Sequence, residues 1–351
     1  MKKVRFGYWI NKPFLWGGPH DALEQGMMAE ESGFDSVWIG DHYMLYAGEF
    51  SETFVALTAI GVKTREIMVS PSVTDPYRRH PATIAQTVAS IDRLTGGRAG
   101  LGIGAGITLN LTPFGIEWRK PLTALKEAIT VIKMLWASTE DEPASFEGEM
   151  FPLHNAYVRV KPVQRPHPPI YVGALGTKTR ELTGKIADGY IPWINSSETY
   201  RDRIKDVERG AREVGRSIEN IDSVAVLPLA VSESVDEARR AVEGYCRTAL
   251  MWEGDILERY GFEISVRRVV PKPRYLFTRE DFKVIEQHAQ EIPIDLVEKI
   301  SAYGTPEDCL DKISEFLEAG ANHIVFFNYS VNLKESMRAF HRKIIPYFKE
   351  G

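Results

Sequence analysis

The sequence predicts an α/β fold, a closed parallel (β/α)₈ TIM barrel with insertions, and two observations lead to this class. Eight short β-rich runs alternate with longer helical patterns along the chain. The 351 residues exceed the roughly 250 residues of a typical closed barrel by about 100, which leaves room for insertions. A doubly wound open sheet is the alternative that the alternation leaves open.

The first four strand–helix units are apolar runs followed by patterns with recognisable helix ends. The pattern that stops at Gly33 places Leu23 and Met27 on one helical face. Another begins with Pro81 in its first turn and ends at Gly96. The strands expected here are 4–10, 34–42, 66–73 and 98–106, and the helices that follow them are 19–33, 50–64, 80–97 and 120–136.

The remaining units continue the alternation, with two interruptions. The strands expected are 168–175, 188–194, 222–231 and 322–329, and the helices are 177–187, 199–215, 234–250 and 305–321. A β-hairpin insertion is expected near 144–160, and a second insertion near 251–300, where the alternation is lost. Because nothing indicates a second core, residues 1–351 are expected to form a single domain.

Composition narrows the class of protein. An apolar fraction of 44% and a charged fraction of 26% are ordinary for a soluble globular chain. The net charge of −5 gives no reason to expect nucleic acid or an anionic membrane as a partner. Only Cys246 and Cys309 occur, so a disulfide framework is excluded. The first residues contain no sustained apolar run, and the expected location is the cytoplasm.

Polar residues follow several predicted strands directly, where a parallel barrel carries its chemistry. Asp41 and His42 end the second strand, and His42 can exchange a proton near neutral pH. Position alone does not distinguish this role from a structural one, in which Asp41 caps the next element and His42 packs beneath a loop. The third strand ends in Ser72-Val73-Thr74, which an ordinary turn explains equally well or better. Arg78 and Arg79 follow. They are candidates for binding an anion, and the alternative is that they are solvated or lie at a subunit interface.

Two glycine-rich stretches follow the fourth and fifth strands. GLGIGAGITLNL begins at Gly100. Its glycines would let a phosphate or a flat ring approach the backbone closely, but a tightly packed segment or a barrel strand also explains them. Residues 173–177 precede a helix, and the backbone N–H groups there suit a phosphate. The alternative is a glycine turn in which Thr177 caps the helix.

The sequence lacks the motifs of several enzyme classes. It contains no P-loop, no H-E-x-x-H and no G-x-S-x-G, which disfavours phosphoryl transfer and zinc-dependent or serine-dependent hydrolysis. The eight histidines show no metal-ligand spacing, so no metal site is expected.

Two longer stretches resemble a known family. Residues 80–106, HPATIAQTVASIDRLTGGRAGLGIGAG, and residues 304–326, GTPEDCLDKISEFLEAGANHIVF, resemble the bacterial-luciferase-like flavin and deazaflavin oxidoreductases. GDHY (40–43), VTDPYRRHPA (73–82) and FGIEWRKP (114–121) are similar to the branch that uses coenzyme F420. Within that branch the chain resembles methylenetetrahydromethanopterin reductase-like and phthiodiolone ketoreductase-like members. The resemblance implies a barrel, usually dimeric, that carries F420 or FMN at its carboxyl mouth.

The resemblance also implies roles for individual residues. His42 is the implied proton donor, Asp41 lies at the deazaflavin ring, and Ser72–Val73 forms a cis peptide behind the ring. The implied cofactor-binding residues are Asp41, Ser72, Val73, Thr74, Gly104, Ala105, Gly106, Gly173, Ala174, Leu175, Gly176 and Thr177. The last five of these would take the phosphate.

Three positions depart from the family pattern. An acidic residue is usual after the G-x-G of the fourth strand, and Ile107 stands there. Tyr8 replaces the acidic residue that the reductase carries near the end of the first strand, and Tyr46 replaces a tryptophan. The remaining proton-transfer candidates are therefore His42 with Tyr8, Tyr43 or Tyr46, and Tyr46 joins Asp41 and His42 in the expected catalytic set.

The function expected is hydride transfer between F420 and a small-molecule carbonyl or alkene of low polarity, by a homodimer. An FMN-dependent luciferase-like monooxygenase is one alternative, and a flavin-binding or deazaflavin-binding barrel without turnover is another. The isoleucine at position 107 keeps that last alternative open.

Overall fold

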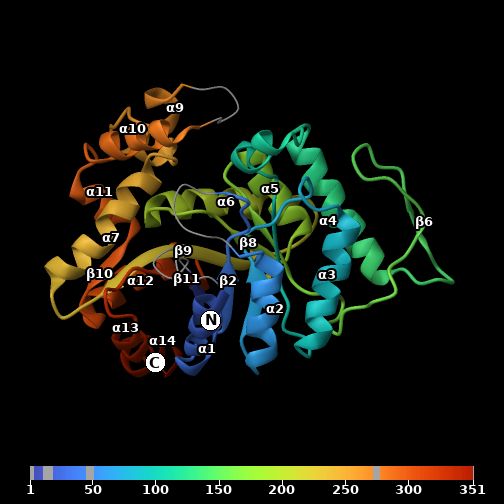
Figure 1. Cartoon of the computed structure of the whole chain (residues 1–351), viewed down its shortest axis with the longest axis horizontal. Helices are drawn as coiled ribbons and strands as arrows, with labels where there is room; N and C mark the ends of the chain where they lie inside the picture. Colours follow the sequence, from blue (N-terminus) through green and yellow to red (C-terminus); the bar gives the residue numbers. More distant parts are fainter. Residues whose placement is uncertain (1–3, 11–18, 45–50, 272–276, 351) are drawn as a thin grey trace.

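The computed structural model describes residues 4–10, 19–44, 51–271 and 277–350, which form a parallel β-barrel surrounded by helices (Figure 1). The predicted (β/α)₈ barrel is confirmed, with strands in the order β3–β2–β1–β11–β9–β8–β7–β4. Their bounds are β1 (Arg5–Trp9), β2 (Ser36–Ile39), β3 (Met68–Pro71), β4 (Leu101–Gly104), β7 (Ile170–Gly173), β8 (Gly189–Ile191), β9 (Asp222–Val231) and β11 (His323–Asn328).

Hydrogen bonds between β3 and β4, the strands at the two ends of this order, close the barrel. Near the amino end, the Gly100 N–H donates to the Val69 carbonyl at 2.9 Å. Just beyond the end of β3, the Thr74 N–H donates to the Gly102 carbonyl at 3.0 Å, and the Gly104 N–H donates to the Thr74 carbonyl at 2.8 Å. Because the sheet closes on itself, the doubly wound open sheet is excluded.

Helices cover the outside of the barrel (Figure 1). α3 illustrates how the sequence builds them: Pro81 starts the helix, and Ile84, Val88 and Ile91 form its buried stripe. Among the described residues, no helix has the length and apolar character needed to cross a membrane. The covering helices are α1 (Pro19–Glu31), α2 (Thr53–Lys63), α3 (Pro81–Leu94), α4 (Pro121–Ala137), α5 (Thr177–Ile186), α6 (Ser197–Glu213), α7 (Val235–Leu250), α12 (Pro306–Glu318), α13 (Leu333–Ala339) and α14 (Ile345–Glu350).

Two segments depart from the strand–helix alternation. Between α4 and β7, β5 (Ala144–Phe146) and β6 (Leu153–Ala156) pair antiparallel and stand off to the right of Figure 1. The Glu127 carboxylate of α4 accepts backbone N–H bonds from three successive residues of the connecting loop, 149–151, which fixes that loop. Between α7 and α12 lie α8 (Gly254–Arg259), α9 (Val266–Val269), α10 (Arg279–Ala289), α11 (Ile294–Ile300) and the short strand β10 (Ala302–Gly304), which pairs with β9.

Alternate residues of each barrel strand face opposite sides. On β1, Phe6 and Tyr8 pack in the layer between barrel and helices, whereas Trp9 belongs to the cluster inside the barrel with Trp38 and Tyr171. This alternation decides which side chains at a strand end can reach the mouth.

Gly102 is required by the close approach of β3 and β4. A Cβ atom at Gly102 would lie 2.1 Å from the Pro71 carbonyl oxygen, a backbone atom that cannot rotate away. Gly102→Ala is therefore expected to lower the free energy of unfolding by about 1–3 kcal/mol, as overpacking does. Urea unfolding measures this change. The control is Gly244→Ala in α7, where a Cβ meets nothing within 4 Å; there alanine is expected to raise stability by about 0.5–1 kcal/mol.

Candidate active site

The carboxyl ends of β2, β3, β4 and β7 bring most of the expected site residues to one end of the barrel. Asp41 and His42 follow β2, and residues 72–74 follow β3. Gly104 ends β4 and residues 105–106 follow it, and residues 173–177 lead from β7 into α5. Parallel pairing places Gly104 beside Gly173. Tyr46, the third expected catalytic residue, lies outside the described residues.

Val73 is held between two glycines at this mouth. The Ser72–Val73 peptide is cis, as the family resemblance implies. A Cβ atom at Gly104 would lie 2.8 Å, and one at Gly173 2.9 Å, from Cγ2 of Val73. Only glycines leave room for this half-buried side chain, which gives the glycine-rich stretch after residue 100 a packing reason. Thr74 is fully buried and pairs through its backbone with β4.

Asp41 lies in contact with both arginines that follow β3. Its Oδ2 accepts from Arg78 Nη2 at 3.1 Å and from Arg79 Nη1 at 2.5 Å. Arg78 also bonds Asp75 at 2.5 Å, and Arg79 pairs with Glu52. The two arginines are thus held by carboxylates of this chain, and Asp41 is placed to orient them beside His42.

His42 is held by a buried amide at the mouth. Its Nδ1 lies 2.8 Å from Nδ2 of Asn110, which is 1% exposed. Burial, with the nearby positive charge of Arg78, lowers the pKa of His42 to about 4, although Asp41 acts in the opposite direction. The ring is therefore neutral near pH 7. The sequence does not indicate a role for Asn110. The only hint is that an amide side chain lies within the apolar run ITLNL.

The prediction that Tyr8 could serve as a proton-transfer residue is wrong. Tyr8 is fully buried on the helix-facing side of β1, and its hydroxyl donates to Gln25 of α1 at 3.1 Å. Burial raises its pKa. The neighbouring position, Trp9, points inward instead. Tyr43 remains at the mouth, where its backbone N–H donates to Asn110 at 2.9 Å.

The start of α5 offers backbone donors without a side-chain cap. Gly176 occupies the N-cap position, and no side chain accepts from the first turn. Thr177 is not the cap; its hydroxyl accepts from Arg180 at 3.1 Å. Leu175 is 52% exposed, and a Cβ at Gly176 would meet nothing within 4 Å. An open, uncapped helix N-terminus suits an anionic group.

Apolar side chains border the mouth after β4. Ile107 is 47% exposed, Phe114 49% and Trp118 42%. Trp118 Nε1 donates to the carbonyl of Ala105 at 2.7 Å, which ties this segment to the end of β4. Phe114 packs edge-on against Tyr43, with ring centroids 4.8 Å apart.

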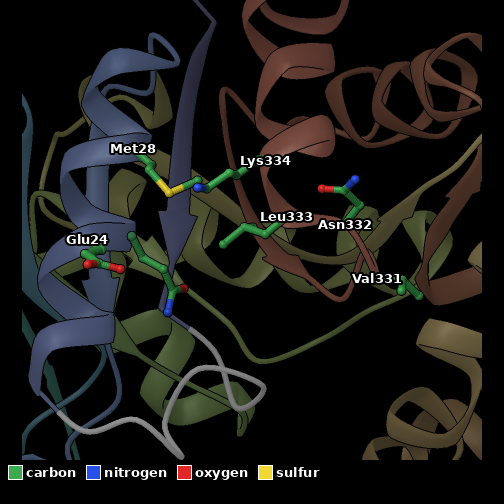
Figure 2. Close-up of a pocket in the computed structure, with 7 residues that line it drawn as sticks. Glu24, Met28, Val331, Asn332, Leu333 and Lys334 are labelled. Atoms are coloured by element: carbon green, nitrogen blue, oxygen red, sulfur yellow. The ribbon is translucent and has the colours of Figure 1, made fainter.

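Two cavities lie away from these residues. One, of about 470 Å³, lies between α1 and the start of α13, where Figure 2 shows Met28 and Lys334 extending toward each other. The other, of about 880 Å³, lies at the amino ends of the strands, beside Arg5 and Asp222. Neither is lined by a predicted site residue.

Known proteins share both the sequence and this fold. A family model described as luciferase-like monooxygenase matches residues 7–323. The chain is 32% identical over 327 residues to the 5,10-methylenetetrahydromethanopterin reductase of Archaeoglobus fulgidus, with 92% of this chain and 94% of that protein covered. It is 30% identical to the phthiodiolone/phenolphthiodiolone dimycocerosates ketoreductase of Mycobacterium bovis, with 90% and 89% covered.

Two solved structures are similar throughout. The coenzyme F420 dependent tetrahydromethanopterin reductase from Methanopyrus kandleri superposes with a TM-score of 0.85 at 26% identity, covering 99% of this chain and 100% of that one. An F420-dependent secondary alcohol dehydrogenase, in complex with an F420-acetone adduct, gives a TM-score of 0.82 at 27% identity and covers 99% of both chains. The barrel, the cis peptide after β3 and the match over residues 7–323 agree, and the chain belongs to the luciferase-like monooxygenase family.

Proposed function

We propose that this protein is an F420-dependent oxidoreductase that transfers a hydride between the deazaflavin and a small carbonyl or alkene substrate of low polarity. The observation that carries the proposal is the mouth itself, where Val73, cradled by Gly104 and Gly173, lies beside the uncapped start of α5. Relatives that match nearly the whole chain are named as F420-dependent enzymes, which supports this choice over FMN.

The residues present fit this cofactor. Residues 72–74 and 104–106 would form the wall against which a flat ring rests, and residues 173–177 would take the phosphate through backbone N–H groups. The bound deazaflavin supplies hydride chemistry that no protein side chain supplies. Asp41 orients Arg78 and Arg79 at the edge of this site, and His42 holds a proton beside it.

The border of the mouth supports a substrate of low polarity. Ile107 stands where the family resemblance implies an acidic residue, and the exposed Phe114 and Trp118 extend the apolar surface. An apolar border desolvates uncharged substrates at low cost and disfavours sugar phosphates. A simple ketone or an activated alkene fits this environment.

Fluorescence titration with oxidised F420 and with FMN tests the cofactor. We expect micromolar binding of F420 and no binding of FMN at the same concentrations. Turnover of reduced F420 with a panel of ketones and alkenes then separates an enzyme from a barrel that only binds its cofactor. Binding of FMN alone would contradict the proposal.

A matched pair of variants sharpens this titration. Gly176→Asp places a carboxylate at the open start of α5, and we expect F420 binding to weaken by about tenfold or more through repulsion of the phosphate. Gly244→Asp adds the same charge on α7, away from the mouth, and should leave the affinity unchanged. Equal affinities would place the phosphate elsewhere.

The assembly and location are part of the proposal. Val55 and Val62 of α2 and Leu94 of α3 are 66%, 53% and 61% exposed, and their two helices lie side by side (Figure 1). An apolar surface of this kind supports a homodimer, which the mass in solution measures. Both cysteines are unpaired and buried, in keeping with a reducing cytoplasm. We take residues 1–351 as one luciferase-like domain with two insertions.

A further inference from the structure

Three hydrogen bonds converge on the side-chain amide of Asn110. Its Oδ1 accepts from the backbone N–H of Tyr43 at 2.9 Å and from that of Met44 at 3.3 Å. Its Nδ2 faces Nδ1 of His42 at 2.8 Å. Asn110 lies in a short helical turn after β4 and is 1% exposed, so it links the ends of β2 and β4 at the mouth.

The two backbone donors determine which way this amide points. A backbone N–H can only donate, so the amide atom that meets Tyr43 and Met44 has to be the oxygen. The amide nitrogen is then the atom that faces His42, and it can only donate. Turning the amide over would leave two backbone N–H groups facing an NH₂ group, and both hydrogen bonds would be lost.

The donor from Asn110 determines the state of the His42 ring. Nδ1 has to be an acceptor, which places the single proton of the neutral ring on Nε2. The Cδ2–Nε2 edge lies over Gly40, where a Cβ would come within 3.4 Å of Nε2. We propose that Asn110 is a positioning residue that locks His42 as the Nε2–H tautomer, so that a substrate oxygen at this mouth meets a hydrogen-bond donor and not a base.

The consequence for chemistry rests on the proposed function. As a donor, Nε2–H would stabilise negative charge on a carbonyl oxygen while hydride adds to the carbon. The same donor would stabilise the alkoxide in the reverse direction, in which the substrate's hydroxyl proton would pass to solvent water and not to His42. This assignment differs from a general acid–base histidine, which requires the ring to gain and lose a proton.

Burial is the main reason that the His42 ring is neutral, and the charged groups around it act in both directions. Arg78 lies on the segment after β3 and disfavours the imidazolium, while Asp41 favours it. Asp41 is itself in contact with Arg78 and Arg79, and Arg78 also binds Asp75, so the carboxylates are shared with two guanidiniums. Arg78 adds to the larger effect of burial, and together they lower the pKa of His42 to about 4.

Nitrogen NMR of the ligand-free protein tests the predicted tautomer of His42 without any cofactor. Long-range proton–nitrogen spectra of ¹⁵N-histidine-labelled protein distinguish a protonated ring nitrogen from an unprotonated one, and loss of one set of peaks in His42→Gln assigns His42. At pH 7 we expect a protonated Nε2 and an unprotonated Nδ1. A protonated Nδ1, in either the neutral or the doubly protonated ring, would overturn the inference. Because no F420 is present, this result is independent of whether F420 binds.

Asn110→Asp should move the ring proton of His42 to Nδ1 with almost no change in side-chain shape. A carboxylate still accepts from Tyr43 and Met44, but it can only accept from His42, so Nδ1 should become protonated. The new negative charge should raise the pKa of His42 by about 1–3 units in an NMR titration. The control is Asn195→Asp, a buried asparagine bonded to Arg203 at 2.7 Å, which should leave both observations unchanged. An Asn110→Asp spectrum identical to that of the wild type would refute the positioning role.

Discussion

Replacing His42 with alanine is expected to slow hydride transfer from reduced F420 to a carbonyl substrate by about 10²–10³-fold, the usual cost of losing one aligned donor to a developing oxyanion. The reason is the neutral ring at the mouth, held through Nδ1 by Asn110 with its proton on Nε2. Binding of oxidised F420 should stay nearly unchanged, because the ring wall and the start of α5 contain no atom of His42.

Single-turnover measurements of F420 reoxidation with a panel of small ketones provide the rate. His42→Gln keeps an amide that can donate and is expected to retain more activity than His42→Ala. His154→Ala, an exposed histidine on β6, is the control and should react as fast as the wild type. Equal rates for His42→Ala and the wild type would exclude His42 from the reaction.

The fold could be predicted because its signals are local. Each barrel strand is a short apolar run, and each helix carries its own stripe and ends, such as Pro81 at the start of α3. Closure of the barrel depends on the Pro71–Gly102 approach, which joins distant parts of the chain. The sequence showed the glycines, but only the structure shows that Val73 is what Gly104 and Gly173 accommodate.

The site could be predicted only in part, because the direction in which a side chain points and the residues that it contacts depend on distant parts of the chain. Tyr8 sits one residue out of phase with the inward-facing Trp9, and a strand's phase relative to the barrel cannot be read from the run RFGYW. Arg78 and Arg79 were compatible with an external anion, yet Asp75 of the same segment and carboxylates from two other segments hold them. Asn110 acquires its role from His42, 68 residues away in sequence.

A second buried histidine lies at the opposite end of the barrel. Trp38 Nε1 donates to Ser36 Oγ, Ser36 is 2.8 Å from His323 Nε2, and His323 Nδ1 is 3.0 Å from Asp222. Tyr171 also donates to Asp222, at 2.8 Å. The order of serine, histidine and aspartate is that of a nucleophilic triad, but Ser36 and His323 are fully buried and no substrate can reach them. This network is therefore structural.

Asp222 is the common acceptor of this network, which makes Asp222→Ala the largest expected loss of stability. Arg5 binds it at 2.8 Å, and removal would leave Tyr171 and His323 with buried unpaired groups and the partly exposed Arg5 without its carboxylate. Breaking a buried pair on one side costs about 3–5 kcal/mol. Since the Arg5 side chain is 32% exposed, we expect about 3 kcal/mol at neutral pH, the lower end of that range.

The same variant should change how stability depends on pH. Burial alone would raise the pKa of Asp222, but His323, Arg5 and Tyr171 outweigh it and lower the pKa below its ordinary value. A carboxyl whose pKa is lower in the folded state stabilises the fold above its unfolded pKa, about 3.9, and that stability is lost as the pH falls through the folded pKa. The difference between wild type and Asp222→Ala should therefore be full at pH 7 and shrink below about pH 4.

Urea unfolding at a series of pH values measures this difference. Asp202→Ala is the control, because Asp202 is 51% exposed and pairs only at the surface with Lys205 and Arg259, so its loss should cost about 0–1 kcal/mol. If Asp222→Ala cost no more than Asp202→Ala at pH 7, the network would contribute nothing to stability. A difference that stayed constant down to pH 3 would instead show that packing around Asp222, and not its charge, stabilises this end of the barrel.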